Sequence, residues 1–146
     1  MKLSEMKARK SGLPEGFTGT KRNWQDVKGD FEVVRVCIRR KPVLNEDGSV
    51  MTYTQGEIAG QTVYDRQVVL QIVTTDDKEF LVYTNSPKLT GLFREGLEDE
   101  PVMKNIFGDE IFVREAPEGL LHFIGVTMEY KNGTKGQVCD LEEVEG

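Results

Sequence analysis

The chain has 146 residues, of which 38% are hydrophobic and 30% charged, a balance typical of a single globular domain. Apolar runs such as Val68 to Leu70 are far too short to span a bilayer, so we expect no membrane association. The first 12 residues carry basic side chains but lack the apolar stretch of a secretory signal, which predicts a cytoplasmic protein, in the host cell if it is viral. Cys37 and Cys139 have no partner histidines, so we expect reduced structural thiols, no metal and no cofactor.

The formal net charge of −6 is distributed very unevenly along the chain. Residues 1–42 contain 11 Lys and Arg against 5 Asp and Glu, residues 43–94 contain 4 against 7, and residues 95–146 contain 4 against 13. A basic beginning and an acidic end are typical of a protein that meets an anion such as nucleic acid while its acidic tail stays solvated. Charge alone fits equally well with two ends that only increase solubility.

The beginning of the chain combines a basic arm with a strand. Residues 1–22 lack apolar periodicity, which predicts a flexible arm, and we expect order to begin near Trp24. Residues 31–44 alternate as in a half-buried strand with a basic outer face. The two alternating sets are Val34, Val36 and Ile38 on one face, and Val33, Arg35, Cys37, Arg39 and Lys41 on the other.

The middle of the chain predicts a long loop, a hairpin and a helix. The loop ends near Asp65 and includes a short ribbon at 50–54. Two β-rich runs, 66–75 and 78–84, are joined at Asp76-Asp77 and predict a hairpin. Residues 86–96 follow as a short helix, with Ser86 as N-cap and Pro87 in the first turn.

The last third of the chain predicts a second hairpin and an acidic tail. Runs 109–115 and 120–130 are strand-like and are separated by a turn that contains proline and glycine. Asn132-Gly133 is a hairpin dipeptide that would allow a sixth short strand. We therefore divide the chain into a flexible basic arm at 1–22, one domain at 23–139 and an acidic tail at 140–146.

Three strands, a helix and two further strands are the element order of the OB-fold, a partly open five-stranded Greek-key barrel with one short helix between strands three and four. The run KEFLVYTNSPKLTGLFREG resembles the strand-to-helix passage of small phage and plasmid single-stranded DNA-binding proteins. LLHFIGV is similar to their last strand, and NWQDVKGD to the segment that enters their first strand. The resemblance covers about residues 24–130. It implies a non-catalytic phage protein that coats single strands during replication or recombination.

Binders of single strands need cations for the phosphate backbone and flat side chains on which bases stack. We expect the cations to come mainly from the first strand and the stacking rings from the long loop, with an ordinary solvated strand face and sheet-edge packing as the alternatives. Tyr83 is expected to face the groove or a partner. The candidate residues are Lys21, Arg22, Arg35, Arg39, Arg40, Lys41, Tyr53, Tyr64, Arg66 and Tyr83.

Other roles for Trp24 and other functions for the chain have less support from the sequence. Trp24 could stack on a base, but a Trp at a domain boundary more often closes the end of a barrel, and we favour that role. His122, the only histidine, has no neighbouring nucleophile, and the glycines form no phosphate loop, so we expect no enzymatic activity. The alternative function is a small viral protein-binding module, such as an inhibitor of a host factor that uses an acidic surface as a nucleic-acid mimic.

The expected partner is therefore single-stranded DNA. The acidic tail predicts two further roles, which are to cover the basic groove and compete with DNA, or to recruit replication or recombination proteins. A solubilising tail without either role is the alternative. Homo-oligomerisation is left open by the sequence.

Overall fold

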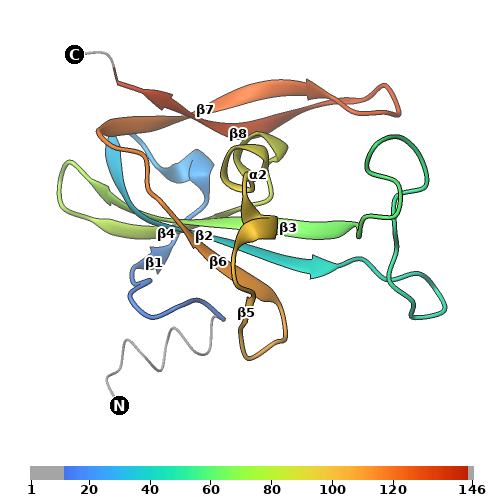
Figure 1. Ribbon diagram of the computed structural model, residues 1–146. Helices are drawn as coiled ribbons and strands as arrows, with labels where there is room; N and C mark the ends of the chain where they lie inside the picture. Colours follow the sequence, from blue (N-terminus) through green and yellow to red (C-terminus); the bar gives the residue numbers. More distant parts are fainter. Residues whose placement is uncertain (1–11, 145–146) are drawn as a thin grey trace.

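The computed structural model describes residues 12–144, and its main feature is one mixed sheet of eight strands (Figure 1). This confirms the prediction of a mostly-β protein. The strands are β1 (Thr20–Lys21), β2 (Phe31–Pro42), β3 (Tyr64–Thr74), β4 (Glu79–Thr84), β5 (Met103–Lys104), β6 (Glu110–Arg114), β7 (Leu120–Glu129) and β8 (Lys135–Glu143). The helices are the 3-10 turns η1 (Trp24–Asp26) and η2 (Leu97–Asp99) and the α-helix α2 (Pro87–Phe93). None of these helices is long and apolar enough to cross a membrane.

The sheet runs in the order β1-β4-β3-β2-β6-β5, and β7 joins it through the first residues of β2 and pairs with β8. The helix α2 lies between β4 and β6, at the place that the sequence predicts. A closed five-stranded barrel is not confirmed, because the sheet has eight strands and its path stays open. On its outer edge β4 pairs only with the two residues of β1, at Phe80 and Leu81, and β8 pairs only with β7, so no ladder closes the sheet in the described residues.

A β-bulge in β2 changes which side chains face the core. The pairing of β2 with β3 shifts between Val33 and Arg35, so Val34 is left out of the register and is 41% exposed. Val33, Val36 and Ile38 consequently lie in the same core cluster. The predicted alternation, which put Val34 on the apolar face and Val33 on the basic face, is therefore wrong on the N-terminal side of the bulge.

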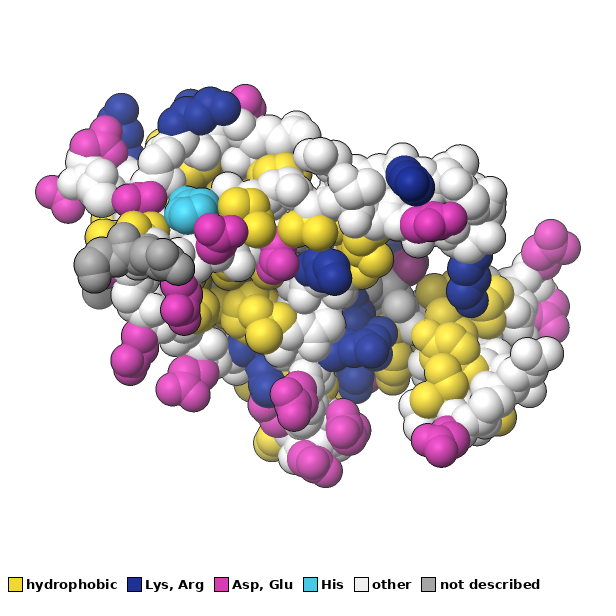
Figure 2. Space-filling model, turned by 90° about the horizontal axis from the view of Figure 1, so that it is seen from above, with side chains coloured by type: hydrophobic (Ala, Val, Ile, Leu, Met, Phe, Trp, Pro, Cys, Tyr) yellow, Lys and Arg dark blue, Asp and Glu magenta, His cyan; other side chains and the backbone are white. Residues whose placement is uncertain are grey.

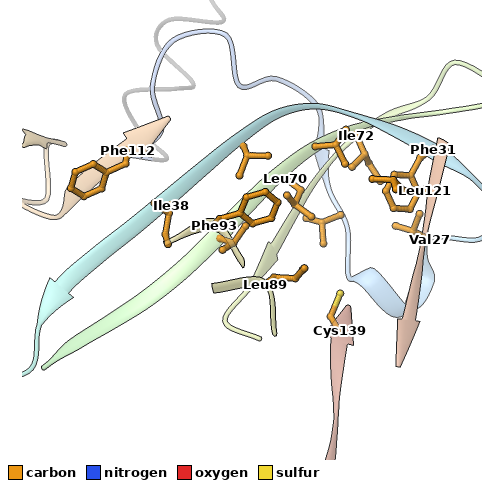
Figure 3. Close-up of a cluster of buried hydrophobic side chains, with 14 of the residues drawn as sticks. Val27, Phe31, Ile38, Leu70, Ile72, Leu89, Phe93, Phe112, Leu121 and Cys139 are labelled. Atoms are coloured by element: carbon orange, nitrogen blue, oxygen red, sulfur yellow. The ribbon is translucent and has the colours of Figure 1, made fainter. Parts of the chain in front are cut away.

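The main core lies between the curved β2-β3-β4 sheet, α2 and the β7-β8 hairpin (Figure 3). Leu89 and Phe93 of α2 point into it because they lie one helical turn apart on the same face. Ser86 occupies the N-cap position, but its side chain makes no capping hydrogen bond. The buried members are Val27, Phe31, Val33, Val36, Ile38, Val68, Leu70, Ile72, Val82, Leu89, Phe93, Leu97, Phe112, Leu121 and Cys139.

The second face of the sheet is covered by the end of the predicted arm. Leu13 and Phe17 are buried against Cys37 and Val69, and β1 pairs with β4. The expectation of a flexible arm is therefore wrong for residues 12–22, because these two apolar side chains bury surface on the sheet. Residues 1–11, the rest of the predicted arm, lie outside the described residues.

The short sixth strand predicted after Asn132-Gly133 is present as β8, and it is longer than the sequence suggested. β8 pairs with β7 along its whole length, from Glu129↔Lys135 to Leu121↔Glu143. The turn between them contains Gly133 at φ 83°, the conformation that the Asn-Gly dipeptide supplies. Asp140 to Glu143, expected in a free acidic tail, are thus strand residues, while residues 145–146 lie outside the described part.

The long loop between β2 and β3 folds back on itself. Isolated bridges join Leu44 to Val50 and Thr52 to Thr62, so the loop forms an irregular ribbon that includes the predicted 50–54 segment. It projects from one end of the sheet, opposite the end at which β8 finishes (Figure 1). Its base borders the candidate site.

Candidate nucleic-acid interface

An open groove of about 320 Å³ lies where β2 and β3 extend beyond β4 and β6. We call it the arginine groove, and Figure 2 shows Lys and Arg side chains gathered at a hollow in this region, with Asp and Glu spread more widely around the rim. Its walls come from the ends of β2 and β3, the β4-α2 turn and the β5-β6 turn. The lining residues are Arg39, Arg40, Lys41, Asp65, Arg66, Gln67, Asn85 and Asp109.

Strand register places two arginines directly opposite each other in this groove. Arg40 of β2 pairs with Arg66 of β3, and on its other side Arg40 pairs with Glu110 of β6. Arg40 and Arg66 continue the faces of Ile38 and Val68, so they lie at the charged end of an apolar stripe. Like charges placed directly opposite each other destabilise a sheet, and Glu110 supplies only one compensating carboxylate.

Aromatic rings hold these arginines in position. The Arg40 guanidinium lies 4.2 Å from the centroid of Tyr64 and 4.9 Å from that of Phe112, and its Nε donates a 2.6 Å hydrogen bond to Glu110. The Arg66 guanidinium lies 5.4 Å from the Tyr64 ring. Tyr64 is thus packed by cations, and its ring positions the arginines by cation–π contact instead of standing free for a base.

Arg66 brings an unused hydrogen-bond donor and cationic neighbours into the groove. Partial burial lowers its pKa, and the positive charges of Arg94 and Arg40 lower it further, whereas Tyr53 and Tyr64 act in the opposite direction. Its Nε is buried and has no hydrogen-bond partner among the described residues. A half-buried guanidinium with an unused Nε donor and cationic neighbours is stabilised by an arriving anion.

A second basic cluster lies on the opposite face of the sheet. Lys21 and Arg39 lie 4.7 Å and 5.5 Å from the centroid of Tyr83, and Arg39 donates a hydrogen bond to the side chain of Gln67. Burial is the main cause that raises the pKa of Tyr83, and Arg39 opposes it. Arg39 and Gln67 alternate with Arg40 and Arg66 along β2 and β3, so they start from the opposite face of the sheet, and they line the arginine groove as well.

The ten predicted site residues are therefore divided among several places. Arg39, Arg40, Lys41 and Arg66 line the groove. Tyr64 lies against Arg66, and Tyr53 is close enough to raise the pKa of Arg66. Lys21 and Tyr83 belong to the opposite face, where Arg35 lies beside the backbone of Gly16. Arg22 lies apart, 5.0 Å from the Phe80 ring.

Sequence reasoning missed Arg94 and Asn85. Arg94 ends α2, and Asn85 follows β4, so their places beside β3 depend on tertiary packing and have no local signature. Among residues 12–144 no group of three or more His, Cys, Asp or Glu side chains is placed to hold a metal ion. The arrangement fits a phosphate at the guanidiniums with a base beside it.

Comparison of the chain with known protein families, with curated proteins and with solved structures finds no match.

Proposed function

We propose that the protein binds single-stranded DNA, without catalysing a reaction, through the arginine groove. The observation that carries this proposal is the Arg40–Arg66 pair, two guanidiniums opposite each other with an unused buried Nε donor on Arg66. A like-charge pair of this kind reduces stability, and such arrangements cluster at functional sites. A phosphate bound between them would supply the missing negative charge and accept from Arg66.

The loop between β2 and β3 supplies a flat side chain for a base. Tyr53 lies in this loop, is 37% exposed and is close enough to Arg66 to affect its pKa. Unlike Tyr64 and Tyr83, it has no cation over its ring among the described residues. A cation next to an open aromatic ring is the combination that holds one nucleotide without reading its sequence.

We further propose that the sheet is an opened form of the OB-fold. β2, β3, β4, β6 and β7 take the parts of its five strands, and α2 takes the part of its helix. The long β2 supports this assignment, because it pairs with β3, β6 and β7 and so belongs to both halves of the sheet. The loop that carries Tyr53 then corresponds to the loop between strands one and two, which borders the binding face of an OB-fold.

A titration followed by fluorescence anisotropy tests the function. A labelled thirty-nucleotide single strand and the matching duplex are titrated with the protein at low and at high salt. We expect tighter binding to the single strand, and an affinity that falls as salt rises, because bound cations release counterions from the DNA. Absence of single-strand binding at low salt would overturn the proposal, and equal or tighter binding to the duplex would do so as well.

A further inference from the structure

The arginine groove is the first of three cavities that share walls. A second cavity of about 290 Å³ lies between the β4-α2 turn and β8. Asn85 lines both it and the arginine groove. A third cavity, of about 500 Å³, lies between η1 and the β7-β8 hairpin, and it shares Trp24 and Gln137 with the second. The three cavities therefore lie next to one another in a row, which we call the seam track.

The seam track follows the open side of the sheet. β4 pairs only with β3 and β1, and β8 pairs only with β7, so no hydrogen-bonded ladder joins β4 to β8 in the described residues. The helix α2 and the turn η1 fill the space beneath this opening and pack against β8 and β4 respectively. The path is thus a consequence of the topology that leaves the sheet open.

The chemistry of the walls changes along the seam track. At the arginine groove the walls are cationic, whereas the second cavity has two aromatic rings, Trp24 and Tyr130, and the amides of Asn85 and Gln137. Tyr130 is 45% exposed and Trp24 is half-buried, so both rings are accessible from the track. Flat rings combined with neutral amides suit nucleobases, which stack on π-faces and offer hydrogen-bonding edges, better than they suit phosphates.

Trp24 does more than close the end of the core. Its ring meets Phe123 edge to face at 6.5 Å on one side, while it forms a wall of two cavities. Gly125 lies close to both residues that the second and third cavities share, because a Cβ there would collide with the end of the Gln137 side chain and lie 3.4 Å from the Trp24 ring. The role that we favour from the sequence, a simple plug, therefore accounts for only one side of the indole.

We propose that a single DNA strand continues from the arginine groove along the seam track, past Asn85, and stacks a base on Trp24. The inference rests on the proposed function and adds a path and a second stacking site to it. A strand that reaches Trp24 must span several nucleotides, so affinity rises with length until the track is filled. Single-strand binders of this size contact about 4–16 nucleotides per domain.

Intrinsic fluorescence tests this path directly, because Trp24 is the only tryptophan in the chain. Labelled thymidine oligonucleotides of six and eighteen nucleotides are titrated, and anisotropy of the label and tryptophan emission are recorded in the same samples. We expect the longer oligonucleotide to bind more tightly and to quench Trp24 in proportion to the bound fraction. Binding by anisotropy with unchanged tryptophan emission would overturn the path but not the function, whereas no change in anisotropy would overturn both.

Substitutions on exposed residues keep the test independent of folding. Asn85→Asp and Gln137→Glu place a negative charge at the two junctions of the seam track, and we expect each to weaken binding of the longer oligonucleotide at least fivefold. Lys104→Gln is the matched control, because it changes the net charge by the same amount on β5, outside all three cavities. Gln137→Glu binding no more weakly than Lys104→Gln would also overturn the path.

Discussion

The Ser86 hydroxyl donates a 2.5 Å hydrogen bond to the backbone carbonyl oxygen of Cys139. Both residues are buried, and they belong to the start of α2 and to β8. The bond therefore joins the two sides of the open sheet at a point where no β-ladder does so. Ser86 occupies the N-cap position of α2, but the bond that its hydroxyl makes is this one across the opening and not a capping bond.

Loss of this hydrogen bond should destabilise the fold. We expect Ser86→Ala to lower the free energy of unfolding by about 1–3 kcal/mol, because the buried carbonyl of Cys139 would lose its hydrogen-bond donor without gaining water. Urea denaturation followed by far-ultraviolet circular dichroism measures the change. Thr90→Ala is the control, since its hydroxyl makes only an exposed 3.4 Å contact within α2 and its loss should cost less than about 0.5 kcal/mol.

Arg66 should dominate the electrostatic part of DNA binding. We expect Arg66→Gln to reduce single-strand affinity about tenfold at low salt and to flatten the dependence of the affinity on salt, because one phosphate contact is lost. The measurement is the anisotropy titration repeated at several salt concentrations. Lys104→Gln carries the same charge change outside the groove, and an equal loss in both variants would mean that general charge, and not the groove, controls affinity.

Tyr53 should contribute through stacking. Replacing it by Leu keeps an apolar side chain in the loop but removes the flat ring, so we expect binding to weaken by about 1–3 kcal/mol. The slope of affinity against salt should stay unchanged, because stacking releases few counterions. A flattened slope in Tyr53→Leu, or an affinity equal to that of the parent, would contradict this role.

Several elements could be predicted from local pattern. β-rich runs bounded by turn residues located β3, β4, β6 and β7 within two residues at each end, and Pro87 marked the first turn of α2. The failures have tertiary causes. The bulge at Val34 has no sequence signature, and the 12–22 segment contains too few apolar residues to reveal that Leu13 and Phe17 pack on the sheet.

The candidate site was predicted only in part, for a related reason. Alternation correctly separates Arg39 and Lys41 from Ile38, but it also assigns Arg40 to the apolar face, where the structure combines it with Arg66 at the end of the core. Sequence distance cannot show that Arg94 approaches them, because this depends on where α2 packs. The charge of the groove therefore depends on the pairing of Arg40 with Arg66 across two strands and on the nearby Arg94.

Buried thiols should make the protein sensitive to alkaline pH. Burial raises the pKa of both Cys37 and Cys139 from 9.0 to about 12 in the folded protein, with Asp140 adding to the effect at Cys139. The unfolded chain loses these protons at lower pH, so this contribution to stability is complete below pH 9 and is lost as the pH rises from about 9 towards 12. Each thiol should cost about 1 kcal/mol per pH unit in that range.

Urea denaturation at pH 8 and pH 10 measures this loss. Other groups also titrate in this range, so the difference between the parent and a Cys37→Ala, Cys139→Ala double variant isolates the thiols. We expect a smaller loss of stability between the two pH values in the variant, whatever its stability at pH 8. The same loss in both proteins would show that the thiols do not contribute.

We expect the acidic end of the chain to stabilise the fold and not to cover the arginine groove. Asp140 to Glu143 pair with β7, and Leu141 packs against the main core. Deletion of residues 140–146 removes four pairs of this ladder, so we expect a loss of several kcal/mol in the free energy of unfolding. Tighter DNA binding by a tail-free protein, expected if the tail were free to cover the groove, should not be observed.

A substitution that removes charge but keeps the strand separates an effect on stability from competition with DNA. Glu143→Gln removes one carboxylate from the exposed end of β8 but keeps the strand, and we expect its stability and its low-salt affinity for single strands to match those of the parent. The end of β8 and the loop that borders the arginine groove lie at opposite ends of the molecule (Figure 1). A low-salt gain in affinity for Glu143→Gln that disappears at high salt would instead show that the acidic end competes with DNA, because salt screens such competition.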